Sequence, residues 1–236
     1  VPIINEGGEA YAKIGVGKST GTKLMSACGN INKPGVYEID MTISVEEFIY
    51  SDEYCGGIAG GKKLKACIPG GSSVPILPAN LLLTTAKGEK RLMNYESLAD
   101  GGFATGSMMG SGGFIVLDED QCVVKHTYTL ARFYRHESCG QCSPCREGTG
   151  WMEKILWNIE NGKGKISDID LLWDIQRKIE GNTICPLGDA AAWPVAAAIR
   201  HFRDEFEWHV KNPAECLTTN YGLAHYADPI HVPVLA

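Results

Sequence analysis

The sequence predicts an α+β protein in which a small β-grasp module precedes a four-helix bundle. Short strand-like runs separated by glycine- and proline-rich turns fill most of the chain before residue 118. After residue 120 the apolar residues recur with a helical period, and the periodic segments end at glycine or asparagine. This change of period predicts two parts with different architectures.

In the part before residue 118, the sequence predicts a hairpin, a short helix and returning strands. Runs at 23–28 and 35–40 flank a turn-rich segment, which is typical of a hairpin. Ser44 is followed three residues later by Glu47, and this capping box predicts the start of a helix. Further strands are expected at 62–68, 74–77 and 114–117. A hairpin, a helix and returning strands in this order favour a β-grasp module.

Three glycine-rich segments raise the question of ligand binding. Gly17-Lys18-Ser19 resembles the end of a phosphate-binding loop, but Ala12 stands where that loop requires glycine. We therefore expect 8–21 to be a connection. At 70–73 a tight turn is favoured over a ligand cradle. At 101–113 the glycines permit close approach either to a planar ligand or to a neighbouring strand, and both alternatives stay open.

The second part predicts four helices around one cysteine-rich segment. They are expected over 122–135, from just after Cys145 to 161, from a capping box at 167–170 to Gly181, and from Pro194 to about Lys211. The positions expected to face the core are Trp151, Ile155 and Ile159, then Leu171, Ile175 and Ile179, then Val195, Ile199, Phe202, Phe206 and His209. Residues 214–236 are expected to form an extended strap that packs against the rest of the protein, or a mobile tail.

Composition excludes several classes of function. A net charge of −6 argues against a nucleic-acid binder that neutralises phosphates. No apolar run approaches the roughly 20 residues that span a bilayer, and no secretory signal is recognisable. Nine cysteines without such a signal favour metal ligands over disulfides. The isolated cysteines are expected to be small buried residues; they are Cys28, Cys55, Cys67, Cys122 and Cys216. The six scattered histidines lack zinc-type spacing.

Four cysteines carry the chemistry of the chain. Cys139, Cys142 and Cys145 form a Cys-x2-Cys-x2-Cys run, and Cys185-Pro186 follows at a distance. Three thiolates on one tight loop plus one remote cysteine before proline is the ligand pattern of a cubane iron–sulfur cluster. The two intervening residues let the chain wrap one corner of the cluster after another. The sequence therefore predicts an electron-transfer centre, and no catalytic residue is assigned.

Structural zinc is the competing interpretation of the same cysteines. Zinc sites usually combine two knuckles of paired ligands, whereas here three cysteines share one run and the fourth stands alone. The spacing therefore favours the cluster. We expect backbone amides near Gly140 and Ser143 to donate hydrogen bonds to the cluster sulfurs, and Arg146 to add positive charge beside four thiolates.

The segments Ser138-Cys-Gly-Gln-Cys-Ser-Pro-Cys-Arg-Glu-Gly148 and Ile184-Cys-Pro-Leu-Gly-Asp189 strongly resemble the NADH-oxidising flavoprotein subunit of respiratory complex I. This family is called the F subunit in bacteria and the 51-kDa subunit in mitochondria. The resemblance covers essentially the whole chain. It extends to Gly7-Gly-Glu-Ala-Tyr11, Gly15-Val-Gly-Lys-Ser-Thr-Gly-Thr22, Lys33-Pro-Gly-Val-Tyr37, Ile68-Pro-Gly-Gly-Ser-Ser73 and Met109-Gly-Ser-Gly-Gly113.

The resemblance implies that NADH binds over FMN in a Rossmann-like domain, and that the four cysteines hold a [4Fe–4S] cluster that passes electrons singly toward quinone. It implies the end of the FMN domain at 1–20, an SLBB-type ubiquitin-like β-grasp domain with a glycine-rich connection at 21–118, and a helical iron–sulfur domain with an extended tail at 119–236. The loop at 185–189 is expected near the flavin. The implied partners are the neighbouring [2Fe–2S] subunit and other peripheral-arm subunits. The implied location is peripheral, on the cytoplasmic face of the inner membrane or on the matrix side in mitochondria.

The family's glycine-rich FMN and NADH loops lie upstream of Val1, so no FMN- or NADH-contacting residue is assigned. We expect this chain to hold a cluster and to be unable to oxidise NADH on its own. Two alternatives stay open. One is the diaphorase subunit of an NAD-linked hydrogenase or formate dehydrogenase, which shares the cysteine segment. The other is a non-redox binding module whose bundle is stapled by zinc.

Overall fold

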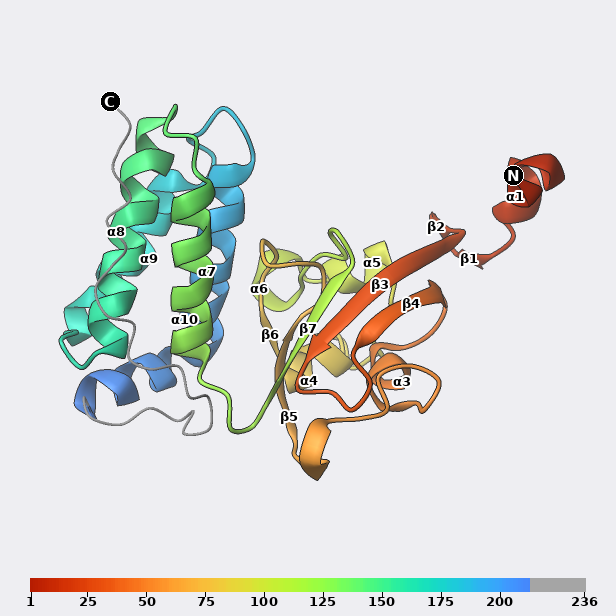
Figure 1. The fold of residues 1–236 in the computed structure, drawn as a ribbon, viewed down its shortest axis with the longest axis horizontal. Helices are drawn as coiled ribbons and strands as arrows, with labels where there is room; N and C mark the ends of the chain where they lie inside the picture. Colours follow the sequence, from red (N-terminus) through yellow and green to blue (C-terminus); the bar gives the residue numbers. More distant parts are fainter. Residues whose placement is uncertain (213–236) are drawn as a thin grey trace. The chain divides into compact units, whose positions relative to one another are not determined.

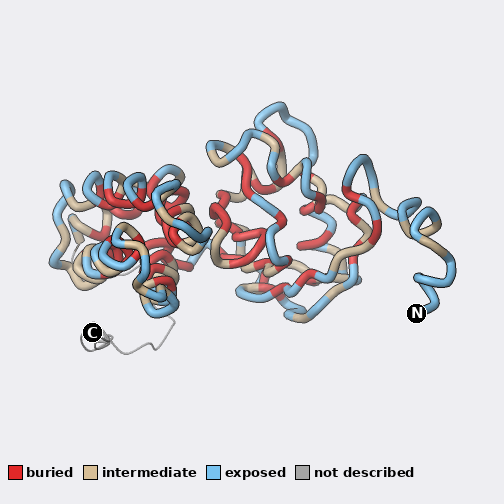
Figure 2. Tube along the Cα trace, turned by 90° about the horizontal axis from the view of Figure 1, so that it is seen from above, coloured by how far each residue is buried: buried red, intermediate tan, exposed pale blue. Residues whose placement is uncertain are grey.

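A computed structural model describes residues 1–212 of the 236-residue chain, so the predicted strap or mobile tail lies outside the described residues. The chain divides into two compact units, one over Val1–Glu119 and one that begins at Asp120 (Figure 1). Figure 2 shows buried stretches of backbone gathered inside each unit. The described part of the chain is a mixed α/β fold.

The first unit is built on a five-stranded mixed sheet with the strand order β4-β3-β7-β5-β6. β3 and β7 are parallel neighbours at its centre, and the other pairs are antiparallel. The strands are β3 (Thr22–Gly29), β4 (Gly35–Asp40), β5 (Leu64–Ile68), β6 (Leu77–Pro78) and β7 (Gly113–Asp118). The predicted hairpin is therefore confirmed, and its first strand pairs with the last strand of the unit.

Helix α3 (Val45–Tyr50) follows the hairpin, as predicted. The hydroxyl oxygen of Ser44 accepts the backbone N–H of Glu47 at 3.0 Å, which confirms the predicted N-cap. Several short elements were not predicted, because each is too short to show the sequence period of a helix or a strand. They are α1 (Pro2–Glu6), α2 (Gly8–Tyr11), β1 (Gly15–Val16), β2 (Ser19–Thr20), η1 (Ala59–Gly61), α4 (Ala79–Leu83), α5 (Tyr95–Ala99) and α6 (Gly102–Thr105).

The strand predicted at 74–77 is wrong for most of its length. The backbone N–H of Val74 closes a turn on the carbonyl of Gly71 at 3.1 Å, and Pro75 has no N–H to donate to a ladder. Regular pairing begins only at Leu77, which lies opposite Cys67.

A fully buried arginine holds the short helices of the first unit together. The Arg91 side chain donates to the carbonyl oxygens of Leu81 (2.9 Å), Leu98 (3.2 Å) and Thr105 (3.0 Å), and also to that of Ser97. These acceptors belong to α4, to α5 and to the end of α6. One guanidinium thus donates to carbonyl oxygens of three short helices.

The glycines of 101–113 serve close approach to neighbouring backbone. A Cβ atom on Gly112 would lie 2.6 Å from the carbonyl oxygen of Leu24, and one on Gly70 would lie 2.7 Å from that of Met109. Real Cβ atoms do not come this close to backbone. The second of the two open alternatives, approach to a neighbouring strand, therefore accounts for Gly112, whereas Gly102 has nothing within 4 Å of such a Cβ.

Up to residue 212, the second unit contains four long helices around one core: α7 (Val123–Glu137), α8 (Ser143–Glu160), α9 (Ile166–Ile179) and α10 (Leu187–Lys211). α7 and α9 each pack against both α8 and α10. Fully buried positions along these helices include Tyr128, Met152, Leu156, Leu172, Val195 and Phe206. None of the helices within residues 1–212 has the length and apolar character that a membrane crossing requires.

Two predicted helix starts are wrong. α10 begins at Leu187, with Pro186 as its N-cap, so Pro194 lies inside the helix and not in its first turn. α9 begins at Ile166, because the carboxylate of Asp168 accepts the backbone N–H of Lys165 at 2.8 Å and fixes the first turn there. The N-cap of α9 is thus Lys165, outside the predicted motif, whereas Pro186 makes no side-chain capping hydrogen bond.

The predicted core faces are right for α10, apart from Phe202, and only partly right for α8 and α9. Trp151 is 53% exposed and Leu171 is 45% exposed, while their neighbours Met152 and Leu172 are fully buried. Both helices carry two adjacent apolar stripes, and the sequence alone does not choose between them. Phe202 is half-buried, since the helix is interrupted at this residue.

Candidate metal centre

The four predicted cysteine ligands lie where helices of the second unit end and begin. Cys139 lies between α7 and α8, Cys142 is the N-cap of α8, and Cys145 is buried in its first helical turn. Cys185 lies between α9 and α10 and is exposed. The predicted loop is thus a loop only up to Cys142, and a helix presents the third thiol.

The structure brings the two cysteine-bearing segments together. The backbone N–H of Ile184, the residue before Cys185, reaches Cys142 Sγ at 3.4 Å. The pKa of Cys145 is raised chiefly by burial, while the hydroxyl of Ser138 lowers it. Two segments separated in sequence therefore meet at one point of the unit.

Hydrogen-bond donors already face two of the sulfurs. The backbone N–H of Ile184 donates to Cys142 Sγ at 3.4 Å, and the hydroxyl of Ser138 lies 3.2 Å from Cys145 Sγ. Donors of this kind favour the thiolate form and adjust the reduction potential of a metal–sulfur centre. Of the predicted donors, the Gly140 amide is directed to the Ser138 hydroxyl oxygen at 3.4 Å, so it supports the serine. The sequence did not single out Ile184 or Ser138 as donors.

Arg146 closes the cysteine segment. Its guanidinium donates to the carbonyl oxygen of Gly140 at 2.8 Å and to the hydroxyl oxygen of Ser143 at 3.4 Å. It also forms an ion pair with Glu147 at 2.9 Å. Gly140 has a φ of +80°, a left-handed conformation that favours glycine. The predicted positive charge is therefore present, but it is shared with a carboxylate and also holds the loop.

The segment that carries Cys185 is held by its own contacts. The Thr183 hydroxyl donates to the carbonyl oxygen of Cys185 at 2.9 Å, and the carboxylate of Asp189 accepts the N–H of Gly181 at 2.7 Å. Gly188 packs directly on Thr183. Asp189 was not predicted to hold this segment; its signal in the sequence is an acidic residue in the first turn of a helix.

The donor set fits a thiolate-bound metal centre. Soft thiolate ligands select iron–sulfur clusters or zinc, and both need four ligands that surround one point.

The isolated cysteines are mostly buried, as predicted: Cys55, Cys67 and Cys122 are buried, and Cys216 lies outside the described residues. Cys28 is exposed, contrary to the prediction, because the alternation of β3 turns it away from the core.

Comparison with known proteins supports the iron–sulfur interpretation. Residues 125–209 match the family described as NADH-ubiquinone oxidoreductase-F iron-sulfur binding region. The F subunit of NADH-quinone oxidoreductase from Rickettsia typhi is 45% identical over 211 residues, which are 89% of this chain and 47% of that protein. The F subunit from Rickettsia conorii is 46% identical with the same coverage. The chain thus spans about half the length of these relatives.

Among solved structures, the chain is similar to an NAD⁺-reducing [NiFe]-hydrogenase. In the H2-reduced state the TM-score is 0.73 at 26% identity, over 89% of this chain and 32% of that one. In the air-oxidised state the TM-score is 0.74 at 26% identity, over 89% and 33%. The identity to the Rickettsia relatives is considerably higher. The chain is therefore similar to the F subunit of NADH-quinone oxidoreductase over 89% of its length, and its residues 125–209 match the iron–sulfur binding region of that family.

Proposed function

We propose that the protein is the electron-input subunit of an NADH:quinone oxidoreductase, in which electrons pass from NADH through FMN to a [4Fe–4S] cluster and on toward quinone. The observation that carries the proposal is the hydrogen bond of 3.4 Å from the backbone N–H of Ile184 to Cys142 Sγ, which joins the Cys185 segment to the cysteine run inside the region that matches the iron–sulfur binding family. The name of the relatives supplies NADH and quinone. FMN enters through the family resemblance alone.

The proposed cluster ligands are Cys139, Cys142, Cys145 and Cys185. A bound cluster supplies one-electron chemistry. The protein's own contribution is to hold the ligands and to surround them with donors. Arg146 holds the segment of the first three cysteines, and the Thr183 hydroxyl holds the segment of Cys185. The Ser138 hydroxyl and the Ile184 N–H, which face the sulfur atoms, offset the negative charge of four thiolates. No catalytic residue is proposed.

The first unit is proposed to be an SLBB-type β-grasp domain, with boundaries at 21–118. In its five-stranded sheet, the first strand (β3) and the last strand (β7) pair in parallel, and helix α3 follows the hairpin of β3 and β4. This order supports the assignment. The second is proposed to be a four-helix bundle domain at 119–236, and 1–20 the end of an FMN-binding domain. The loop at 185–189 is proposed to face the flavin; the 88% exposure of Ile184 leaves it open to a partner.

The proposed partners are the neighbouring [2Fe–2S] subunit and other peripheral-arm subunits of the complex. The proposed location is peripheral, on the cytoplasmic face of the inner membrane, or the matrix side in a eukaryote. The name of the relatives supports a place in a quinone-reducing complex. The net charge of −6 gives no support to a nucleic-acid partner.

A second candidate function is the diaphorase subunit of an NAD-linked hydrogenase or formate dehydrogenase. The similarity to an NAD⁺-reducing [NiFe]-hydrogenase favours it, at a TM-score of 0.73. The 45% identity to the Rickettsia typhi relative, against 26% to the hydrogenase, favours the first candidate. Co-purification separates the two, since a hydrogenase would copurify with nickel and the proposed complex with quinone-reducing activity.

The ligand assignment is tested by the variant Cys142→Ser after anaerobic reconstitution with iron and sulfide. Cys142 makes no capping hydrogen bond, and serine is a favourable N-cap, so the substitution removes a thiolate without weakening α8. We expect loss of most of the bound iron and of the [4Fe–4S] signal in low-temperature electron paramagnetic resonance. Cys28→Ser, at an exposed cysteine of the first unit, is the matched control. Full iron and an unchanged spectrum in Cys142→Ser would refute the assignment.

A further inference from the structure

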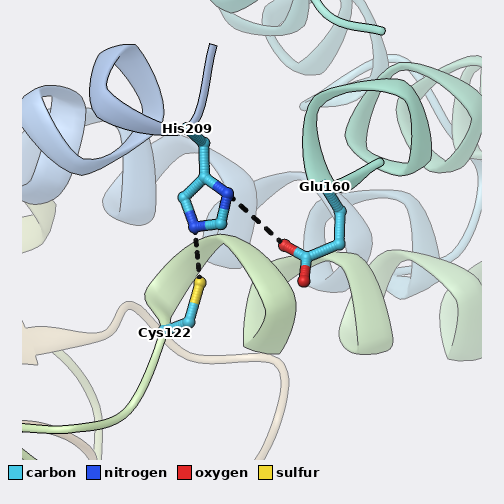
Figure 3. A group of neighbouring side chains, drawn as sticks. All are labelled: Cys122, Glu160 and His209. Carbon is cyan, nitrogen blue, oxygen red and sulfur yellow. Dashed lines mark hydrogen bonds and ion pairs between the residues drawn. The ribbon is translucent and has the colours of Figure 1, made fainter. Parts of the chain in front are cut away.

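A second group of metal-binding side chains lies in the second unit, far from the four cysteines. It consists of Cys122, Glu160 and His209 (Figure 3). Cys122 is the N-cap of α7, and Glu160 is the last residue of α8. The cysteine segment adjoins the other end of α8, and a helix of 18 residues is about 27 Å long. The two groups of side chains therefore form separate sites.

An interruption in α10 brings His209 to this position. Phe202 has a φ of −134° and a ψ of 27°, which breaks the helical conformation. After this residue the last turns of α10 run in a new direction, across the ends of the neighbouring helices (Figure 1). Glu205, Phe206 and His209 on these turns are buried. The short terminal part of α10 thus covers the start of α7 and the end of α8.

The three side chains are close and buried. Cys122 Sγ lies 2.9 Å from His209 Nε2, and His209 Nδ1 lies 3.9 Å from Glu160 Oε2. One ligand atom from each residue lies within 4.8 Å of the other two. Cys122 and His209 are at most 1% exposed, and the Glu160 side chain is 14% exposed. Three helices therefore direct a thiol, an imidazole and a carboxylate at one small volume.

We propose that Cys122, Glu160 and His209 bind a zinc ion that fixes the terminal part of α10 to α7 and α8. Thiolate, imidazole and carboxylate are the three side-chain ligands that zinc uses. The backbone N–H of Lys125 donates to Cys122 Sγ at 3.4 Å, and the start of a helix favours the thiolate. Metal binding releases the thiol proton to solvent.

The distances require only small side-chain movements. Zinc bonds of about 2.0–2.3 Å in a tetrahedron place neighbouring ligand atoms about 3.3–3.7 Å apart. The sulfur–Nε2 separation of 2.9 Å must open slightly, and Glu160 must rotate toward Nε2, because a metal takes only one nitrogen of the ring. Without metal, Nε2 is hydrogen-bonded to Cys122 Sγ, and Glu160 Oε2 lies 3.9 Å from Nδ1. The imidazole therefore changes partner at one nitrogen only.

A second carboxylate stands beside the site. Glu205 precedes His209 by one helical turn, and its Oε1 accepts the N–H of Val123 at 2.7 Å. Val123 is the residue after Cys122, so Glu205 orients the start of α7 next to the sulfur. Removal of such supporting groups usually lowers metal affinity by roughly 10- to 100-fold. Sequence spacing could not find this site, since Cys122 and His209 are 87 residues apart.

The test uses protein whose cluster site has first been filled by anaerobic reconstitution with iron and sulfide. After incubation with zinc sulfate and desalting, we expect one zinc per chain in addition to the cluster iron. Zinc-edge X-ray absorption is expected to show one sulfur at about 2.3 Å and two or three nitrogen or oxygen neighbours at about 2.0–2.1 Å. A shell of four sulfurs would place zinc on the cluster cysteines and overturn the proposal, as would the absence of bound zinc.

Variants assign the ligands. His209→Gln and Cys122→Ser are expected to weaken zinc binding by more than the roughly 10- to 100-fold typical of supporting groups, with the iron content unchanged, and Glu205→Gln by about tenfold. The matched controls are the variants His136→Gln and Cys28→Ser, each at an exposed residue. Both variants should bind zinc with the affinity of the wild type. Equal affinity in His209→Gln and wild type would contradict the proposal. If Cys122→Ser does not fold, the absorption spectrum and His209→Gln decide. A zinc-free protein with an intact cluster refutes this proposal alone, and a zinc-loaded protein without a cluster refutes only the proposed function.

Discussion

Replacing Gly188 by alanine should disturb the segment that carries Cys185. Gly188 lies in the first turn of α10 against Thr183, whose hydroxyl donates to the Cys185 carbonyl oxygen. A Cβ atom at residue 188 would lie 2.6 Å from Thr183 Cγ2 and 3.0 Å from Thr183 Cβ, and closer still to Oγ1. Thr183 must therefore move, and its hydrogen bond to Cys185 is strained or lost.

The magnitude follows from two opposing effects. Overpacking of this kind costs about 1–3 kcal/mol, whereas alanine in a helix gains up to about 1 kcal/mol over glycine. We expect Gly188→Ala to lower the free energy of unfolding of the second unit by about 1–2 kcal/mol. With a urea dependence of about 1–3 kcal/mol/M, the midpoint falls by roughly 0.3–2 M. Iron retention at the cluster site should fall as well.

Tryptophan fluorescence isolates this effect, since all five tryptophans lie between residues 151 and 208, in the second unit. Gly150→Ala is the matched control, because its Cβ would meet nothing closer than 3.6 Å and should leave stability unchanged or raised. Thr183→Ala removes the two closest atoms, so the double variant Gly188→Ala/Thr183→Ala should recover stability, with a coupling energy of about 1 kcal/mol. Strict additivity, or a Gly188→Ala midpoint equal to that of Gly150→Ala, would refute the reasoning.

Three further outcomes are expected. Arg91→Met removes the guanidinium that donates to the partly buried carbonyl groups of Leu81 and Thr105 and should destabilise the first unit by about 1–3 kcal/mol, measured as faster hydrogen exchange over residues 79–105; unchanged exchange would contradict this. Arg135→Leu leaves the buried carboxylate of Glu153 without its ion pair and should cost about 3–5 kcal/mol by tryptophan fluorescence, while Arg135→Leu/Glu153→Leu should recover most of it. Burial raises the pKa of the Cys55 thiol from 9.0 to about 12, so the folded state keeps a proton that the unfolded state loses above pH 9. Stability of the first unit should therefore decline between about pH 9 and pH 12, and Cys55→Ala should flatten that decline in hydrogen-exchange measurements.

Local signals predicted much of the fold. The hairpin of β3 and β4 and the cap at Ser44 were predictable because turn residues and capping act over a few residues. The proposed cysteine ligands could be named from the sequence for a similar reason, since three of them share one short run. Cys185 was included only because cysteine before proline belongs to a known cluster pattern.

The errors have tertiary causes. Pro194 reads as a helix start, yet the packed helix extends past it to Leu187, since one lost hydrogen bond costs less than burial of the additional turns in the core contributes. The helices α4 to α6 depend on the side chain of Arg91, which comes from a segment with no regular pattern. The juxtaposition of Cys122 with His209 depends on the break at Phe202. None of these has a signal within a short window of sequence.

The central claim is that Cys139, Cys142, Cys145 and Cys185 hold a [4Fe–4S] cluster. It is tested most directly by low-temperature electron paramagnetic resonance of the dithionite-reduced protein after anaerobic reconstitution, together with iron and sulfide analysis. The account predicts about four irons and four sulfides per chain and the signal of one reduced [4Fe–4S] cluster. A reduced sample without that signal, whose four cysteines instead hold one zinc in a four-sulfur shell, would contradict it.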